Sequence, residues 1–149
     1  MILPLTRLTP ADMKFMSMFP WKEEYSVGYP EIDNQHKKLF EFAEELHNAM
    51  IYGKGKYVLE KTLSKLIAYT KGHFAAEERL MQTHNYPDYP KHKAVHDALT
   101  ARVVAFQKEF EANRTALTVD LLLFLKDWLC HHIGETDRKI ASYLKSKAA

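Results

Sequence analysis

Apolar residues recur at alternating intervals of three and four positions in four segments of the chain after residue 30. This spacing places side chains on one face of an α-helix, and few segments show the period of two that marks a half-buried strand. The pattern therefore predicts four amphipathic helices. Their inward stripes are Ile32, His36, Leu39, Ala43, Leu46 and Met50; Leu59, Leu63, Leu66, Thr70, His73, Glu77 and Leu80; Tyr89, His92, His96, Leu99, Val103, Phe106 and Phe110; and Leu122, Leu125, Leu129, His132, Ile133, Ile140 and Leu144.

Residues that break helices separate the four segments. Gly53 and Gly55 form the first break, residues 84–90 form the second, and residues 113–118 form the third, with Thr118 as a candidate N-cap. Connections this short force neighbouring helices to run antiparallel. The expected fold is all-α: an up-down-up-down antiparallel four-helix bundle with an N-terminal arm.

The N-terminal region carries no comparable stripe. Residues 1–20 are predicted to be an N-terminal extension, and residues 21–149 are predicted to form one domain. We expect the chain up to about residue 29 to be an arm that packs across the bundle through Phe19, Trp21 and Tyr25.

Composition narrows the function classes. A net charge of +2, without a basic cluster interleaved with aromatic residues, argues against a nucleic-acid partner. The longest uninterrupted apolar run, residues 121–125, is far shorter than the roughly 20 residues of a membrane span. No signal-peptide pattern is found at the N-terminus, and the single cysteine, Cys130, allows no internal disulfide. We expect a cytoplasmic protein without a membrane partner.

The unusual feature of the composition is histidine. Five of the eight histidines fall on the inward stripes, together with Glu77 and with no lysine or arginine. A buried carboxylate without a cation costs several kcal/mol, and five buried imidazoles would leave many ring nitrogens without partners. Within the second and third stripes, His73 and Glu77, and likewise His92 and His96, are spaced i, i+4, so each pair projects from one helix face. A bound metal ion would satisfy both groups of side chains.

Other residues with chemical potential fall off the stripes. His47, His84 and His131 are predicted to lie at the surface or between helices. Glu44 and His47 spell the Glu-x-x-His pattern of di-iron carboxylate oxidases, but those sites need that pattern twice. These residues are not expected to bind metal.

Four short motifs span most of the chain from residue 21 to about residue 144. They are Asp33-Asn-Gln-His36; His73-Phe-Ala-Ala-Glu77-Glu; Tyr86-Pro followed by His92-Lys-Ala-Val-His96; and Trp128-Leu-Cys-His-His132-Ile-Gly-Glu-Thr-Asp137. With these motifs in this order, the chain resembles the hemerythrin family, in particular its single-domain bacterial members.

The resemblance implies two iron ions joined by an oxo or hydroxo bridge. His92, His96 and His132 would bind one iron, His36 and His73 the other, and Glu77 and Asp137 would bridge them. Spacing alone does not select Asp137, because it lies five residues after His132, about 140° around an α-helix. Glu135, three residues after His132, remains an alternative on spacing.

The resemblance also implies a function. One coordination position would stay open on the iron held by two histidines, where dioxygen would bind reversibly as hydroperoxide for storage or delivery. The chain would thus be an oxygen-binding protein rather than an enzyme. Alternatives are a di-iron enzyme that reduces peroxide or nitric oxide, and an oxygen-sensor module. The implied walls of the oxygen pocket are Leu39, Phe74, Trp128, Leu129 and Ile133.

Overall fold

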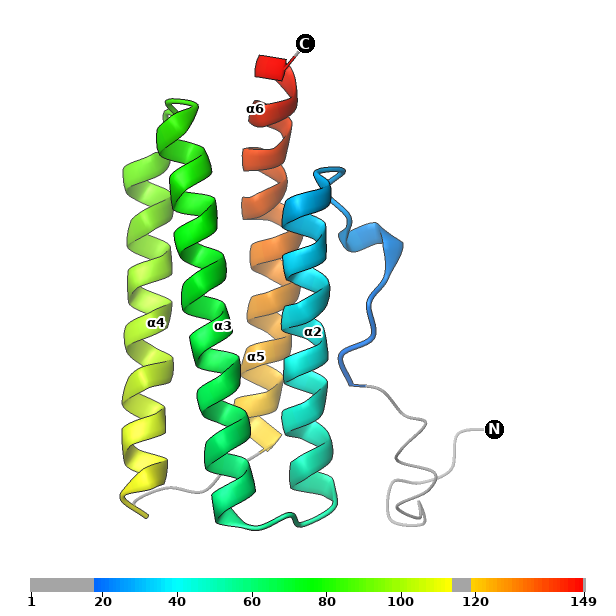
Figure 1. Cartoon of the computed structure of the whole chain (residues 1–149), viewed down its shortest axis with the longest axis vertical. Coiled ribbons are helices and arrows are strands. Elements are labelled where there is room, and N and C mark those ends of the chain that lie inside the picture. Colours follow the sequence, from blue (N-terminus) through cyan, green and yellow to red (C-terminus); the bar gives the residue numbers. More distant parts are fainter. Residues whose placement is uncertain (1–17, 114–118, 149) are drawn as a thin grey trace.

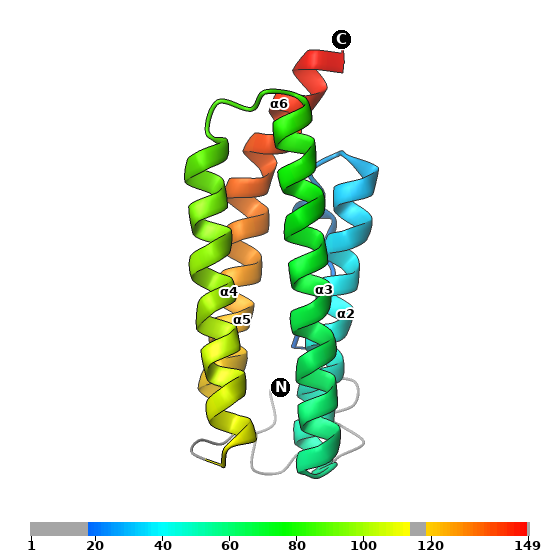
Figure 2. The same ribbon diagram turned by 60° about the vertical axis from the view of Figure 1, so that its left-hand side comes forward.

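The computed structural model describes residues 18–113 and 119–148, and it confirms the predicted four-helix bundle. Four long helical rods lie side by side and alternate in direction (Figures 1 and 2). The first three rods are α2 (Pro30–Ile51), α3 (Lys56–Thr83) and α4 (Tyr89–Glu111). The fourth is built from α5 (Val119–His131), the π-helical turn η3 (His132–Asp137) and α6 (Arg138–Ala148). A short 3₁₀ turn, η2 (Glu23–Tyr25), precedes the bundle.

The breaks that separate the helices fall close to their predicted positions. Gly53 and Gly55 adopt φ angles of 58° and 87°, in the left-handed region that glycine enters without steric cost. The second break ends earlier than expected, because α4 begins at Tyr89 and Pro90 lies in its first turn. Proline is tolerated there, since the N–H it lacks would have no partner within the helix. Thr118, the candidate N-cap, lies outside the described residues.

The bundle core consists of two apolar clusters with a polar layer between them. On α2, Ile32 belongs to one cluster and Leu39 to the other, and both are 1% exposed. His36 lies between these two residues on the same helix face. On α3, Ile67 and Met81 belong to opposite clusters in the same way, so His73 and Glu77 lie between the two clusters.

The arm packs against the bundle, as predicted for Phe19, Trp21 and Tyr25. Phe19 is 3% exposed, and its backbone N–H donates to the Glu44 carboxylate at 2.6 Å. The Tyr25 ring stacks on Phe40 at 5.2 Å, and Trp21 contacts both rings edge-on. Residues 1–17, which make up most of the predicted extension, lie outside the described residues.

Helix α6 fastens the arm and the α3–α4 connection to the bundle. Arg138 donates to the Glu24 carbonyl at 2.7 Å, and Lys145 donates to the Val27 carbonyl at 2.6 Å. The Tyr143 hydroxyl donates to the His84 carbonyl at 2.7 Å. These three bonds hold the end of the bundle that lies beyond the polar layer.

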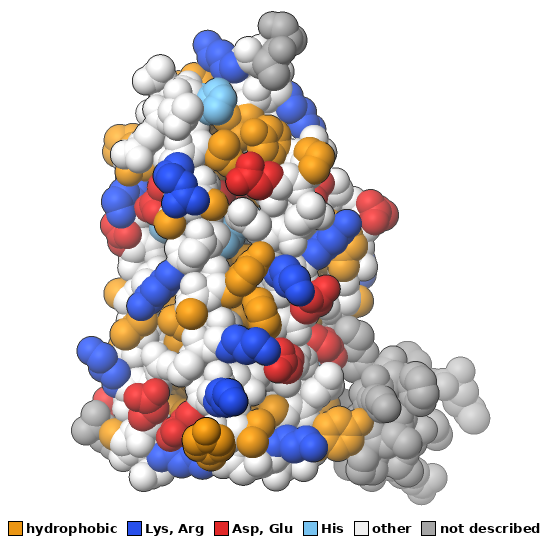
Figure 3. Space-filling model, in the orientation of Figure 1, with side chains coloured by type: hydrophobic (Ala, Val, Ile, Leu, Met, Phe, Trp, Pro, Cys, Tyr) orange, Lys and Arg blue, Asp and Glu red, His pale blue; other side chains and the backbone are white. Residues whose placement is uncertain are grey.

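Basic and acidic side chains are interspersed over the face seen in Figure 3. Within the described residues, no helix combines the length and apolar character needed to cross a membrane.

Candidate metal centre

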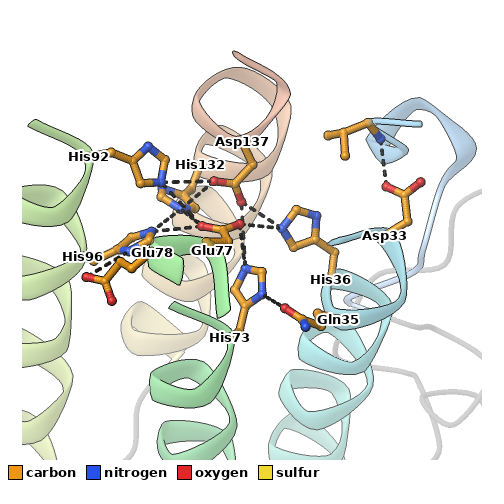
Figure 4. A network of polar contacts seen from close by, with 11 residues as sticks. Asp33, Gln35, His36, His73, Glu77, Glu78, His92, His96, His132 and Asp137 are labelled. Carbon is orange, nitrogen blue, oxygen red and sulfur yellow. Dashed lines mark hydrogen bonds and ion pairs between the residues drawn. The ribbon is translucent and has the colours of Figure 1, made fainter. Parts of the chain in front are cut away.

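The seven residues predicted as metal ligands converge in the polar layer (Figure 4). All are buried, with exposed fractions of 0–4%. Each helical rod contributes at least one side chain: His36 from α2, His73 and Glu77 from α3, His92 and His96 from α4, and His132 and Asp137 from η3.

Glu77 lies between two groups of histidines. Its Oε1 is 3.0 Å from His73 Nε2 and 3.6 Å from His36 Nε2. The other oxygen, Oε2, is 3.1 Å from His96 Nε2 and 3.5 Å from His92 Nε2. Each oxygen of this carboxylate therefore faces a different pair of imidazoles.

Asp137 divides its oxygens in the same way. Its Oδ2 is 2.8 Å from His36 Nε2, whereas its Oδ1 is 3.0 Å from His132 Nε2 and 3.4 Å from His92 Nε2. Two carboxylates thus span the same pair of histidine groups. This is the arrangement that carboxylates adopt when they bridge two neighbouring cations.

The π-helical turn explains how Asp137 reaches the layer. A π-helix closes its turns with i→i+5 hydrogen bonds, so residues five apart share a face. His132 and Asp137 have that separation, and both are buried. Glu135, the alternative on spacing, is instead exposed and lies 3.4 Å from His131. This local widening of the helix places Asp137 in the polar layer and leaves Glu135 at the surface.

The buried carboxylates are held in their charged form. Burial alone would raise the pKa of Glu77, but the charge of His73 and the close contacts of Glu77 Oε1 with the His36 and His73 imidazoles lower it well below its usual range. Burial and the charge of Glu77 would also raise the pKa of Asp137. The charge of His132, its close contact with Oδ1 and the hydrogen bond from His36 to Oδ2 outweigh both effects and lower the pKa of Asp137.

The imidazoles respond to the same carboxylates. Burial alone would lower the pKa of His36, but the hydrogen bond to Asp137 and the close contact with the Glu77 carboxylate outweigh burial and raise the pKa to about 9. Burial would also lower the pKa of His92, but the Asp137 and Glu77 carboxylates close to its Nε2 raise it to about 9. For His96, burial prevails and its pKa is lowered. Without a metal ion, protons on some of these imidazoles compensate the two carboxylates.

The residues present fit a pair of metal ions. Several inward-facing atoms have no hydrogen-bond partner among the described residues: His73 Nε2, His92 Nε2, both Glu77 oxygens and Asp137 Oδ1. Two sets of donors each gather within 4.8 Å, and they share both carboxylates. One set is Glu77, His92, His96, His132 and Asp137, and the other is His36, His73, Glu77 and Asp137.

Two of the five predicted pocket residues contact histidines of this centre. The Phe74 ring stacks on His96 with centroids 3.8 Å apart, and Trp128 stacks on His132 at 5.2 Å. The remaining three, Leu39, Leu129 and Ile133, are at most 2% exposed. Trp128 and Leu129 also line a small apolar cavity of about 20 Å³. Apolar cavities of this size remain dry.

The residues set aside on sequence grounds stay outside the cluster. His84 Nδ1 donates to the Leu80 carbonyl at 2.9 Å, and His47 lies 3.5 Å from Glu44. Glu44, the glutamate of the Glu-x-x-His pattern, accepts the Phe19 N–H and so helps to hold the arm against the bundle.

The sequence reasoning missed the polar groups behind the histidines. His73 Nδ1 donates to Gln35 Oε1 at 2.6 Å, and His96 Nδ1 lies 3.9 Å from Glu78 (Figure 4). Both Gln35 and Glu78 belong to the quoted motifs. Gln35 directly precedes His36, and Glu78 directly follows Glu77. This adjacency to predicted ligands could have marked both residues as partners of the centre.

Comparison with known proteins bears on the identity of this cluster. The family model of the hemerythrin HHE cation binding domain matches residues 27–144. The chain is 34% identical over 124 residues to a bacteriohemerythrin of Methylococcus capsulatus, covering 83% of this chain and 94% of that protein. It is 27% identical over 121 residues to a myohemerythrin of Theromyzon tessulatum, covering 81% of this chain and 89% of that protein.

Solved structures agree with these relatives. A crystal structure of wild-type hemerythrin superposes with a TM-score of 0.81 at 33% identity, covering 85% of this chain and 98% of that one. A hemerythrin point mutant gives a TM-score of 0.82 at 32% identity, covering 87% of this chain and 98% of that one. With the fold, the buried donor cluster and the family match in agreement, the chain belongs to the hemerythrin family.

Proposed function

We propose that the seven clustered residues hold two iron ions and that the chain binds dioxygen reversibly at this centre. The observation that carries the proposal is the division of both carboxylates between two histidine groups, which forms two donor sets that share Glu77 and Asp137. The proposal also draws on family membership and on the relatives named bacteriohemerythrin and myohemerythrin.

The donor chemistry supports iron in an oxygen-binding role. Imidazole nitrogens suit iron, and a bridging carboxylate can neutralise charge on two ions at once. Di-iron carboxylate proteins of the ferritin type take a glutamate from each of two helices and a Glu-x-x-His pair from each of the other two. This cluster instead has five histidines and two carboxylates. Fewer anionic ligands stabilise high-valent iron less, which favours binding over oxidation chemistry.

The first donor set contains one histidine more than the second. Three histidines belong to the first set, whereas His36 and His73 are the only histidines in the second. If the two ions have equal coordination numbers, the ion held by His36 and His73 would have one position left for an exogenous ligand. Two iron(II) ions would together supply the two electrons that reversible binding of dioxygen requires.

The surrounding side chains would exclude water from that position. Phe74 and Trp128 stack on two of the histidines. Leu39, Leu129 and Ile133 are buried in one of the two apolar clusters that border the polar layer. A dry pocket suppresses proton leakage and loss of a reactive ligand. In this proposal the protein contributes orientation, charge compensation and exclusion of water.

Oxygen cycling of the reduced protein tests the proposed function. The iron-loaded protein, reduced anaerobically and exposed to dioxygen, should form a stable coloured adduct that disappears when the gas is removed. Repeated cycles should return the same absorption spectrum. Rapid irreversible oxidation without an adduct would instead indicate an enzyme that reduces peroxide or nitric oxide, and would contradict oxygen binding.

Substitution of individual histidines should separate ligands from bystanders. His92→Ala and His132→Ala each remove one imidazole from the buried cluster, so the iron bound per chain should fall below that of the unmodified protein. His84→Ala is the matched control, because the His84 side chain donates to a backbone carbonyl outside the cluster. Iron analysis after gel filtration gives the readout. Equal iron loss in all three variants would contradict the assignment.

Metal binding should invert the pH dependence of stability. In the metal-free chain the pKa values of His36 and His92 are raised from 6.5 to about 9. Their stabilising contribution is therefore complete below pH 6.5 and is lost as the pH rises through 9. In the metal-bound chain the same nitrogens must be unprotonated, so protons compete with the metal and binding strengthens as the pH rises.

Urea unfolding at several pH values between 6 and 9 checks this expectation. The metal-free protein should lose stability over that range, whereas the iron-loaded protein should not. Parallel profiles for the two forms would show that the histidines do not exchange protons for metal.

A further inference from the structure

The polar groups behind the metal-facing histidines differ between the two donor sets. His73 Nε2 lies 3.0 Å from Glu77, and its other nitrogen, Nδ1, donates to Gln35 Oε1 at 2.6 Å. A proton held on Nδ1 leaves the Nε2 lone pair directed into the centre. Figure 4 shows Gln35 at the side of His73 that faces away from the carboxylates.

Among the described residues, Gln35 is the only side chain that accepts a hydrogen bond from the outer ring nitrogen of a histidine in the second donor set. His36, the other histidine of that set, has a buried Nδ1 without a hydrogen-bond partner in the described part of the chain. Gln35 directly precedes His36 on α2, whereas His73 is on α3. One dipeptide of α2 therefore supplies one histidine of this set and orients the other.

The three-histidine set has a different polar group behind it. His96 Nδ1 lies 3.9 Å from the Glu78 carboxylate, beyond hydrogen-bond distance. Lys93 Nζ lies 3.3 Å from the same carboxylate and offsets its charge. The partner of His73 is thus close and uncharged, whereas the group behind His96 is distant and anionic.

We propose that Gln35 is a positioning residue for the second iron, fixing the tautomer of His73 and keeping that imidazole a neutral ligand. This inference rests on the proposed di-iron function. A carboxylate at this position would accept the same proton but make the imidazole more basic. Stronger donation would stabilise iron(III) at the ion with the open position. An uncharged amide therefore favours the iron(II) state to which oxygen release must return.

Two substitutions separate the positioning role from the electronic one. Gln35→Leu removes the acceptor at similar volume, so the affinity of the second iron site, which contains His36 and His73, should fall about 10- to 100-fold, as for other outer-shell partners. Gln35→Glu retains an acceptor, so both ions should still bind. That variant should nevertheless show a more negative midpoint potential and faster autoxidation.

The measurements use the full-length iron protein. Anaerobic iron(II) titration against a competing chelator gives the two affinities, and spectroelectrochemistry gives the potential. Gln107→Leu is the control, because it makes the same chemical change on α4 about 16 Å from the level of His96. Its iron affinities and potential should match those of the unmodified protein. Circular dichroism establishes that each variant is folded.

Separate outcomes distinguish this inference from the proposed function. If the unmodified protein binds no iron or oxygen, the proposed function itself fails. If it binds both, and Gln35→Leu matches Gln107→Leu in affinity, the positioning role is overturned. An unchanged potential in Gln35→Glu would overturn the electronic role, and a Gln35→Leu variant that does not fold leaves that second test intact.

Discussion

The structure depends on one electrostatic constraint: two carboxylates and five imidazoles are buried together inside an otherwise apolar bundle. Among the described residues, the only other buried polar side chains are Thr62 and Thr70, and both donate to carbonyls of their own helix. Leaving Glu77 and Asp137 charged at this depth costs several kcal/mol unless positive charge lies beside them. Protons can supply part of that charge, and metal ions can supply all of it.

The surrounding architecture follows from holding this layer in place. Four antiparallel helices approach it from four sides, and apolar clusters close it at both ends. The π-helical turn directs Asp137 inward, at the point where a regular α-helix would have turned it away. Helix α6 continues beyond this turn and fastens the arm and the α3–α4 connection.

Much of the fold and most of the cluster could be predicted from the sequence, because both follow helical periodicity. The +3/+4 stripes located the helices, the five histidines and Glu77. Asp137 could not be selected by spacing, since a π-turn is a tertiary outcome and periodicity assumes a regular helix. Gln35 was missed for another reason: its hydrogen bond joins two helices, and the chain order does not show that pairing.

The central claim is that two metal ions, rather than protons alone, compensate the buried carboxylates. Anaerobic titration of the metal-free protein with iron(II), followed by calorimetry with proton release recorded in parallel, tests it most directly. The account predicts saturation at two iron ions per chain, with protons displaced as the ions bind. Saturation at one ion, or no binding by a folded chain, would contradict it.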